Sequence, residues 1–193
     1  MKSLSLVLCS ALFLTACASH TPTHIALNPN VPVSEYKIDR FDSVAVSTID
    51  VRKANFIVRF NKEGEAAKLV SPSEPIRQQL DDVFKKAMRN AGYQVDPAAS
   101  HTAQFQLDYL LTDVTESTFG FEAKTALTIN VVAKNENQEF TKIYNARGML
   151  KGPFSPDFAT LELDMNKLID ELTTKIINDA ELHQFYNNNT HAE

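Results

Sequence analysis

The sequence predicts an α+β protein, a two-layer sandwich in which two main helices pack on one face of a mixed, mostly antiparallel sheet. Three long segments, residues 103–115, 121–134 and 138–150, alternate apolar and polar side chains, as strands with one buried face do. Two further segments, residues 76–91 and 158–177, place apolar side chains along one helical stripe. Because the buried face of such a sheet must be covered, the two helices are its expected cover.

Length and composition are those of one globular domain. The chain has 193 residues, of which 44% are hydrophobic and 22% charged, values close to the average of soluble domains. Its net charge of -5, from 24 acidic against 19 Lys and Arg side chains, disfavours binding to nucleic acid, which needs a positive surface. Its two cysteines, Cys9 and Cys17, provide neither a disulfide framework nor a Cys-rich zinc site.

Residues 1–16 are predicted to be a secretory signal peptide. Lys2 supplies the positive charge, and residues 4–13 form an apolar stretch too short to span a bilayer comfortably. The stretch ends in Leu14-Thr15-Ala16-Cys17, which resembles the bacterial lipobox, where the cysteine is lipidated and becomes the mature N-terminus. We therefore expect acyl chains on Cys17 to anchor the protein in a membrane. The alternative is an ordinary secreted protein with a buried cysteine.

The residues after the predicted lipidation site, Ala18 and Ser19, bear on sorting. Proteobacterial lipoproteins held in the inner membrane typically carry Asp directly after the lipidated cysteine. The absence of Asp here resembles sorting to the outer membrane, with the domain facing the periplasm of a two-membrane bacterium. The expected partners are the membrane, through the lipid on Cys17, and an envelope protein.

The predicted mature chain has three parts: the lipidated cysteine and a flexible tether in residues 17–35, one periplasmic domain in residues 36–187, and a disordered tail in residues 188–193. Small, polar and proline residues without periodicity make up most of the tether. Ile25 and Leu27 leave one alternative open, because an extended segment that carries them could lie along the domain.

The predicted domain begins with strands. Residues 43–50 are apolar on both faces, which is typical of a central strand. Residues 55–60 form a second predicted strand. A turn at residues 61–64 supplies a glycine for a positive φ, and residues 66–70 return as a hairpin partner.

The first helix has clear start and stop signals. Ser71 or Ser73 is the expected N-cap, with a proline in the first turn in either case, and Gly92 is the expected left-handed residue after the last turn. The apolar stripe consists of Ile76, Leu80, Val83, Phe84, Ala87, Met88 and Ala91. A short strand at residues 93–95 follows.

The long strands and the last helix complete the fold. On the first long strand, Phe105, Leu107, Tyr109 and Leu111 are predicted to share one face. The last helix is predicted to start at Ser155-Pro156, as N-cap and first helical residue. Its stripe consists of Phe158, Leu161, Met165, Leu168, Ile169, Leu172, Ile176 and Ile177. Asn178-Asp179 is expected to interrupt the helix, with Asp179 capping a short final turn.

No catalytic constellation stands out. The sequence has no GxSxG nucleophile elbow, no Walker motif and no dinucleotide-binding glycine pattern. His101 is predicted to lie in a solvated loop, and no Ser–Asp pair is placed near it or near His183. His20 and His24 have the spacing of helical metal ligands, but Pro22 between them argues against that helix. We therefore expect a protein that is not an enzyme and has no catalytic, cofactor-binding or metal-binding residues.

Two short segments are candidate contact sites for a partner. Asp50 and Arg52 end the strand at residues 43–50 either as a local ion pair or as part of a binding surface, and we favour the ion pair. Phe119 and Phe121 flank a glycine between two long strands. They form an exposed aromatic tip that contacts a partner or a glycan, or they pack under the last helix.

Five segments of the chain are informative when taken together: the lipobox, residues 25–30 (IALNPN), the strand ending in Asp50-Val51-Arg52, the helix ending in Ala91-Gly92-Tyr93 and the C-terminal run 166–182. Together they resemble the YajG family of small proteobacterial lipoproteins. These motifs are structural, so the resemblance implies a lipoprotein and carries over no catalytic or ligand-binding residue. The order of elements is also similar to that of small periplasmic modules that assist envelope machines, such as lipoproteins of lipopolysaccharide assembly and of lipid transport.

The sequence thus predicts one function and keeps two alternatives. We expect a non-enzymatic outer-membrane lipoprotein that serves as a periplasmic binding or accessory module and needs no cofactor. The first alternative is an accessory subunit of a lipid or lipopolysaccharide transport or assembly machine, which needs an apolar groove or a sheet edge for docking. The second, which the sequence disfavours, is a periplasmic hydrolase, which needs polar groups that converge in a pocket.

Overall fold

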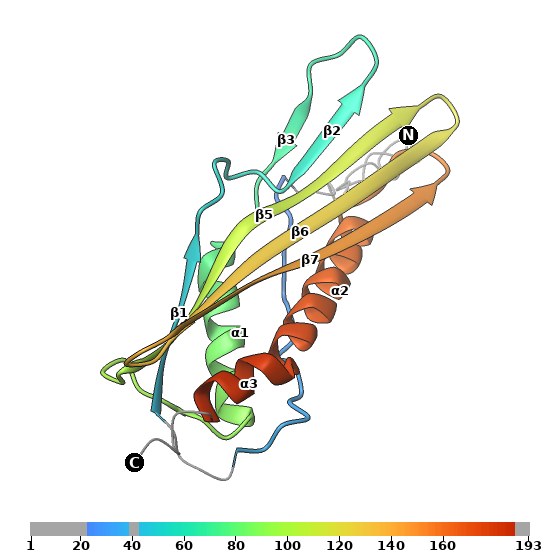
Figure 1. The fold of residues 1–193 in the computed structure, drawn as a ribbon. Coiled ribbons are helices and arrows are strands. Elements are labelled where there is room, and N and C mark those ends of the chain that lie inside the picture. Colours follow the sequence, from blue (N-terminus) through green and yellow to red (C-terminus); the bar gives the residue numbers. More distant parts are fainter. Residues whose placement is uncertain (1–22, 39–42, 188–193) are drawn as a thin grey trace, which may run out of the picture.

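The computed structural model describes residues 23–38 and 43–187 (Figure 1). The predicted signal peptide, Cys17, Ala18, Ser19 and the tail at residues 188–193 lie outside the described residues. In chain order the elements are β1 (Ser43–Asp50), β2 (Val58–Lys62), β3 (Lys68–Val70), α1 (Ile76–Asn90), β4 (Gln94–Val95), β5 (His101–Ser117), β6 (Gly120–Lys134), β7 (Glu139–Gly152), α2 (Phe158–Ile177) and α3 (Ala180–Asn187). None of the helices described combines the length and the apolarity needed to cross a bilayer.

The sheet is organised around β5. On one edge of this strand, β6 and then β7 follow as an antiparallel meander. Two shorter strands share the other edge, both parallel to β5: β1 pairs with residues 101–107 and β2 with residues 112–116. β4 continues the sheet beside β1, and β3 beside β2. The edge of β5 between residues 107 and 112 therefore lies in a gap between β1 and β2.

The helices cover one face of this sheet (Figure 1). α1 packs mainly on β1, and α2 packs mainly on β7. In the core between them, the ring of Phe84 from α1 stacks on Phe105 from β5, with centroids 3.8 Å apart. The α+β class, the mixed sheet and its helical cover are confirmed. The two-layer sandwich is not confirmed, because the sheet curls into a half-barrel instead of forming a flat layer.

The predicted apolar stripes are buried, but the predicted N-caps are wrong. Every residue of the α1 stripe is at most 4% exposed, and on α2 only Phe158 is half-buried. Ser71 and Ser73 do not cap α1, because their backbones pair with Ile25 and leave Pro75 at the N-cap position. Asp157 caps α2 by accepting a hydrogen bond from the Thr160 amide at 2.7 Å.

The remaining predicted turns and ends agree with the structure. Gly92 follows α1 with a φ of 103°, and Gly64 in the turn between β2 and β3 has a φ of 76°. Asp179 lies between α2 and α3 and accepts a hydrogen bond from the Glu181 amide, as expected of a cap. β2 begins three residues later than the predicted strand, because the chain before it leaves the sheet.

A β-bulge changes the face of two predicted core residues. The register of β5 against β6 shifts between Leu107 and Tyr109. Past this point Leu110 faces the core and is 3% exposed, whereas Tyr109 is 44% exposed on the opposite face. The prediction that Tyr109 and Leu111 share a face with Phe105 is therefore wrong, because one extra residue in a strand reverses the alternation.

The predicted flexible tether is wrong for the part that the structure describes. Residues 23–35, here called the N-terminal strap, lie extended along α2 (Figure 1). Ile25 and Leu27 are buried in the core. The amides of Ala26, Asn28, Asn30 and Glu35 donate to side chains of α2 or its C-cap: Glu162, Asn166, Asp170 and Asn178. The alternative of an extended segment along the domain describes this region correctly.

Candidate functional site

The first predicted contact site, Asp50 with Arg52, is a bidentate ion pair at the end of β1. Nε and Nη2 of Arg52 donate to the two carboxylate oxygens of Asp50 at 2.9 and 2.7 Å. The Arg52 side chain is 7% exposed and that of Asp50 is 25% exposed. Nη1 of Arg52 is buried without a hydrogen-bond partner. The pair therefore forms the local ion pair that the sequence favours, and it fixes the chain where β1 leaves the sheet.

The gap between β1 and β2 forms a cavity of about 450 Å³ beside β5. Residues 51–57 connect β1 to β2 there, and Val51 and Phe56 line the cavity together with Tyr109 and Leu111 of β5. Burial raises the pKa of Asp108, which lines the same cavity at the bulge. The cavity therefore combines apolar walls with a few polar groups, which is the usual make-up of a ligand or peptide contact site.

A second hollow of about 350 Å³ continues this region over the outer face of the sheet. It shares Tyr109 and Leu111 with the first cavity and extends to Arg147 and Met149 of β7. Met149 is 58% exposed. The two hollows together form a partly apolar surface on the side of the sheet opposite the helices, here called the outer hollow.

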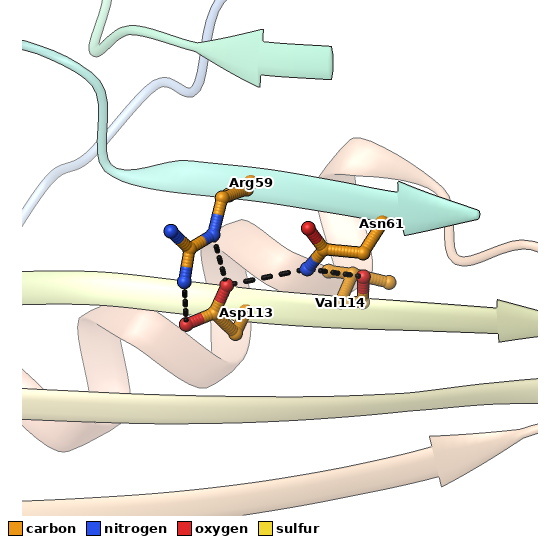
Figure 2. Close-up of polar contacts among 4 residues, drawn as sticks. All are labelled: Arg59, Asn61, Asp113 and Val114. Atoms are coloured by element: carbon orange, nitrogen blue, oxygen red, sulfur yellow. Dashed lines mark hydrogen bonds and ion pairs between the residues drawn. The ribbon is translucent and has the colours of Figure 1, made fainter. Parts of the chain in front are cut away.

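An ion pair between β2 and β5 borders the outer hollow (Figure 2). Nε and Nη2 of Arg59 donate to the two carboxylate oxygens of Asp113 at 2.5 and 2.8 Å, and the Asn61 amide donates to the same carboxylate at 3.3 Å. The hydrogen bonds and the charge of Asp113 raise the pKa of Arg59. Since the neighbours of Asp113 on β5, Thr112 and Val114, are fully buried, Asp113 faces away from the core. The pair therefore joins the two strands on the outer face.

The two residues of the second predicted contact site, Phe119 and Phe121, differ in exposure. Phe119 lies at the tip of the β5–β6 turn and is 91% exposed. Phe121 is half-buried and packs against the core. Its ring covers Gly152 of β7, where an added Cβ would lie 2.7 Å from ring atom Cε1. One ring of the pair therefore projects from the protein, and the other packs across the sheet.

Phe154 is an exposed aromatic side chain that sequence reasoning missed. It lies between β7 and α2 and is 84% exposed. Its φ of 64° makes it the one non-glycine residue with positive φ among the residues described, a conformation that costs about 1–3 kcal/mol. The surrounding Gly152-Pro153 and Ser155-Pro156 signal an irregular loop, so the sequence contains a signal for its exposure.

The two histidines considered for catalysis pack against aromatic side chains. His101 is the first residue of β5, is half-buried and stacks on Tyr186 with centroids 6.0 Å apart, so its placement in a solvated loop is wrong. His183 is 1% exposed. Nε2 of His183 lies 2.7 Å from the Ile177 carbonyl and Nδ1 lies 2.9 Å from the Tyr93 hydroxyl. Because a carbonyl only accepts, Nε2 carries the proton and Nδ1 accepts from Tyr93.

In the described part of the chain, no group of three or more His, Cys, Asp and Glu side chains is arranged to hold a metal ion. The charged pair Arg59 and Asp113 and the outer hollow were not predicted. Their only sequence signal is the opposite charge of two residues 54 positions apart, which becomes meaningful once β2 and β5 are known to pair.

Comparisons with known proteins place the chain among lipoproteins. A family model described as "Uncharacterized lipoprotein" matches residues 29–187. The uncharacterized lipoprotein YajG of Escherichia coli K12 is 23% identical over 181 residues, which cover 93% of this chain and 94% of the relative, and YajG of Escherichia coli O6:H1 strain CFT073 matches to the same extent. The resemblance to the YajG family is therefore confirmed.

A solved structure shares the fold. A protein from Xanthomonas campestris has a TM-score of 0.56 and 10% sequence identity, over 86% of this chain and 99% of that chain. At this identity the likeness concerns the fold alone.

Proposed function

We propose that this chain, which belongs to the uncharacterized lipoprotein family, is anchored in the outer membrane by a lipid on Cys17 and acts as a non-enzymatic binding or accessory module in the periplasm. Family membership is the observation that carries the anchor, together with the lipobox at Leu14–Cys17. Several acyl chains on one cysteine hold a protein far more firmly than one chain does. The proposed outer-membrane location rests on Ala18 and Ser19, because neither is the Asp typical of retention in the inner membrane.

The outer hollow supports binding as the role of the domain. It offers apolar side chains, Tyr109, Leu111 and Met149, beside charged groups on a rigid sheet. The conspicuous polar groups are instead engaged with one another: Arg52 with Asp50, Arg59 with Asp113, and both ring nitrogens of His183 with Tyr93 and Ile177. A histidine whose two nitrogens are occupied has no free site from which to act as a general base.

The accessory role in a lipid or lipopolysaccharide machine is the second candidate, and an observation favours it. β7 pairs with β6 alone among the described strands, so its other edge is open to an added strand over 14 residues. Ile143 and Met149 on this strand are 60% and 58% exposed. A partner that adds a strand to β7 would meet both the open edge and these apolar side chains.

The anchor and its sorting are tested by replacing two residues. Cys17→Ser should abolish incorporation of labelled palmitate and leave an uncleaved precursor, because the thiol is the acylated group. Ala18→Asp should move the protein toward the inner membrane on a density gradient, whereas Ala18→Asn should not, because only Asp is typical of retention there. A Cys17→Ser protein that is still acylated and processed contradicts the lipobox, and an unchanged gradient for Ala18→Asp contradicts the sorting proposal.

The binding role is tested by photocrosslinking in intact cells. A benzophenone amino acid in place of Tyr109 should form a discrete crosslinked product, identifiable by mass spectrometry, because this side chain lies in the outer hollow. The same amino acid at Val33, which is 80% exposed on the strap and outside the hollow, is the control. Equal labelling at both positions contradicts a specific contact in the hollow. Strong labelling at Ile143 alone favours the accessory role through β7.

A further inference from the structure

Three loops, which follow β2, β5 and β7, meet at one end of the molecule. β2, β5 and β7 run in the same direction, because β2 is parallel to β5 and β6 is antiparallel to both β5 and β7. Their C-terminal ends therefore lie together, as Figure 1 shows. The Ser155 hydroxyl donates to the Glu116 carboxylate, and a hollow of about 600 Å³ joins residues of all three loops, among them Lys62, Thr118 and Phe154. We call this end the loop end.

The loop end exposes two large aromatic side chains. Phe119 and Phe154 are 91% and 84% exposed, more than the other large apolar residues described. The backbone at Phe154 is held at positive φ, an unfavourable conformation for an aromatic residue. Exposed aromatic side chains on adjacent loops are typical of a contact surface.

The direction of the N-terminal strap indicates where the membrane lies. The strap runs along α2 from Glu162, which binds the Ala26 amide, to Asn178, which binds the Glu35 amide. Its first described residue, Thr23, therefore lies toward the start of α2, and α2 begins directly after the loop that carries Phe154. The strap thus leads the chain toward the loop end.

The chain between the anchor and the strap is short. Five residues lie between Cys17 and Thr23, so Thr23 is six Cα–Cα steps from Cys17, and a fully extended chain of this length spans at most about 20 Å. The turn between β6 and β7, at the opposite end of the sheet, is about 50 Å away along β6. A lipid on Cys17 therefore keeps the loop end close to the bilayer.

We propose that Phe119 and Phe154 insert into the interfacial region of the phospholipid bilayer that carries the lipid anchor. In this orientation the loop end of the domain contacts the membrane. This inference rests on the proposed lipid anchor at Cys17. Aromatic rings are favourable at this depth, where they leave water without crossing the bilayer. The occupant is a lipid surface, because the reach of the chain from Cys17 to Thr23 holds these rings near one.

The contact is apolar rather than electrostatic. Lys62 of the loop end pairs with Glu65 at 2.6 Å. Lys124 and Lys151 both pair with Glu122, at 2.5 and 2.6 Å, and their hydrogen bonds lower the pKa of Glu122 to about 2. Two carboxylates thus partner these three lysines, and Glu63 and Glu116 also line the hollow of the loop end, so this end carries no excess of positive charge. The contact is therefore expected to persist at high salt and without anionic lipid.

Single-tryptophan variants of the full-length lipidated protein test this proposal, because the chain has no tryptophan of its own. Phe119→Trp, Phe154→Trp and the control Ile143→Trp are purified from membranes and reconstituted into phosphatidylethanolamine vesicles, with or without lipids brominated near the head of the acyl chain. Ile143 is the matched control, since it is 60% exposed and lies about 30 Å along β7 from the loop end. Circular dichroism verifies that all three variants fold.

Bromine should quench the tryptophan emission of Phe119→Trp and Phe154→Trp at least about twofold more than that of Ile143→Trp, because only interfacial rings meet the brominated chains. The quenching should be unchanged in high salt. Vesicles that carry the protein on flotation but quench none of the three variants overturn the membrane contact and leave the anchor intact. Equal quenching at all three positions overturns the proposed orientation, in which the loop end contacts the membrane. A protein that fails to float with the vesicles refutes the anchor and the inference with it.

Discussion

At the scale of single residues, His183 shows how burial turns a titratable side chain into a structural one. It stacks between Tyr36 and Tyr93, with centroids 4.4 and 5.8 Å away. Burial lowers its pKa, although the hydrogen bond to the Ile177 carbonyl and the charge of Asp179 oppose this. Protonation would place a second donor, Nδ1–H, against a hydroxyl that already donates to it. The folded protein therefore favours the neutral ring.

The stability of the fold should consequently depend on pH through His183. In the unfolded chain a histidine takes up a proton near pH 6.5, whereas the folded protein resists this uptake. The unfolded state binds more protons in this window, so the free energy of unfolding should decrease as the pH falls below about 6.5. His183→Gln, which keeps one donor and one acceptor but does not titrate, should reduce that decrease in urea unfolding measured at pH 7.5 and pH 5.

The neighbouring Asp179 does not interfere with this test. Burial by itself raises the pKa of Asp179, but hydrogen bonds from Lys142 and Tyr144 outweigh it and lower the pKa, so that the carboxylate stays ionised across this window. Identical pH dependence of unfolding in the wild type and in His183→Gln would show that His183 does not carry the effect.

At the scale of elements, the N-terminal strap is part of the fold. Ile25 is fully buried and exchanges two backbone hydrogen bonds with Ser71 and Ser73 just before α1, while the rest of the strap follows α2. It thereby connects the start of one helix with the whole length of the other. Because the described strap begins six positions after the proposed lipidation site, it would also transmit the position of a lipid on Cys17 to the domain.

Truncation of the strap core should destabilise the domain. Ile25→Ala should lower the free energy of unfolding by about 2–5 kcal/mol, as for other buried aliphatic residues, because it leaves a cavity in the hydrophobic core. Val33→Ala, in the same strap but 80% exposed, should change it by less than about 0.5 kcal/mol. Urea unfolding measures both.

A chain that begins at residue 36 extends the same test. It lacks the strap and should unfold at lower urea concentration than a chain that begins at residue 23. Equal stability of these two chains, or of Ile25→Ala and the wild type, would show that the strap is a flexible tether and not part of the fold.

At the scale of the whole molecule, the curled sheet separates two surfaces. The face toward α1 and α2 is filled by the core, whereas the outer face carries the outer hollow and the Arg59–Asp113 pair. The gap between β1 and β2 gives this face its cavity, because neither strand covers the middle of β5. If the loop end contacts the membrane as proposed, the outer face is directed parallel to the plane of the membrane, where a partner can reach it.

The sequence by itself determined the α+β class, the two helices with their buried stripes, the antiparallel meander and the family. Each of these depends on local periodicity, such as the stripe from Ile76 to Ala91, or on short motifs such as the lipobox. It also indicated the Asp50–Arg52 pair, whose members are two residues apart, so that their contact needs little knowledge of the fold.

The tertiary structure alone decided the strap, the bulge, the outer hollow and the packing of His101 and His183. Ile25 and Leu27 have too little local pattern to signal burial, because the segments they lie against are distant in the chain. Ser71 and Ser73 pair with Ile25, and side chains of α2 bind the neighbouring amides of Ala26 and Asn28. The bulge at Asp108 is invisible in the alternation of β5, since Leu110 and Leu111 are both apolar. Long-range pairing sets these features. Local sequence patterns do not show which distant segments of the chain will lie side by side.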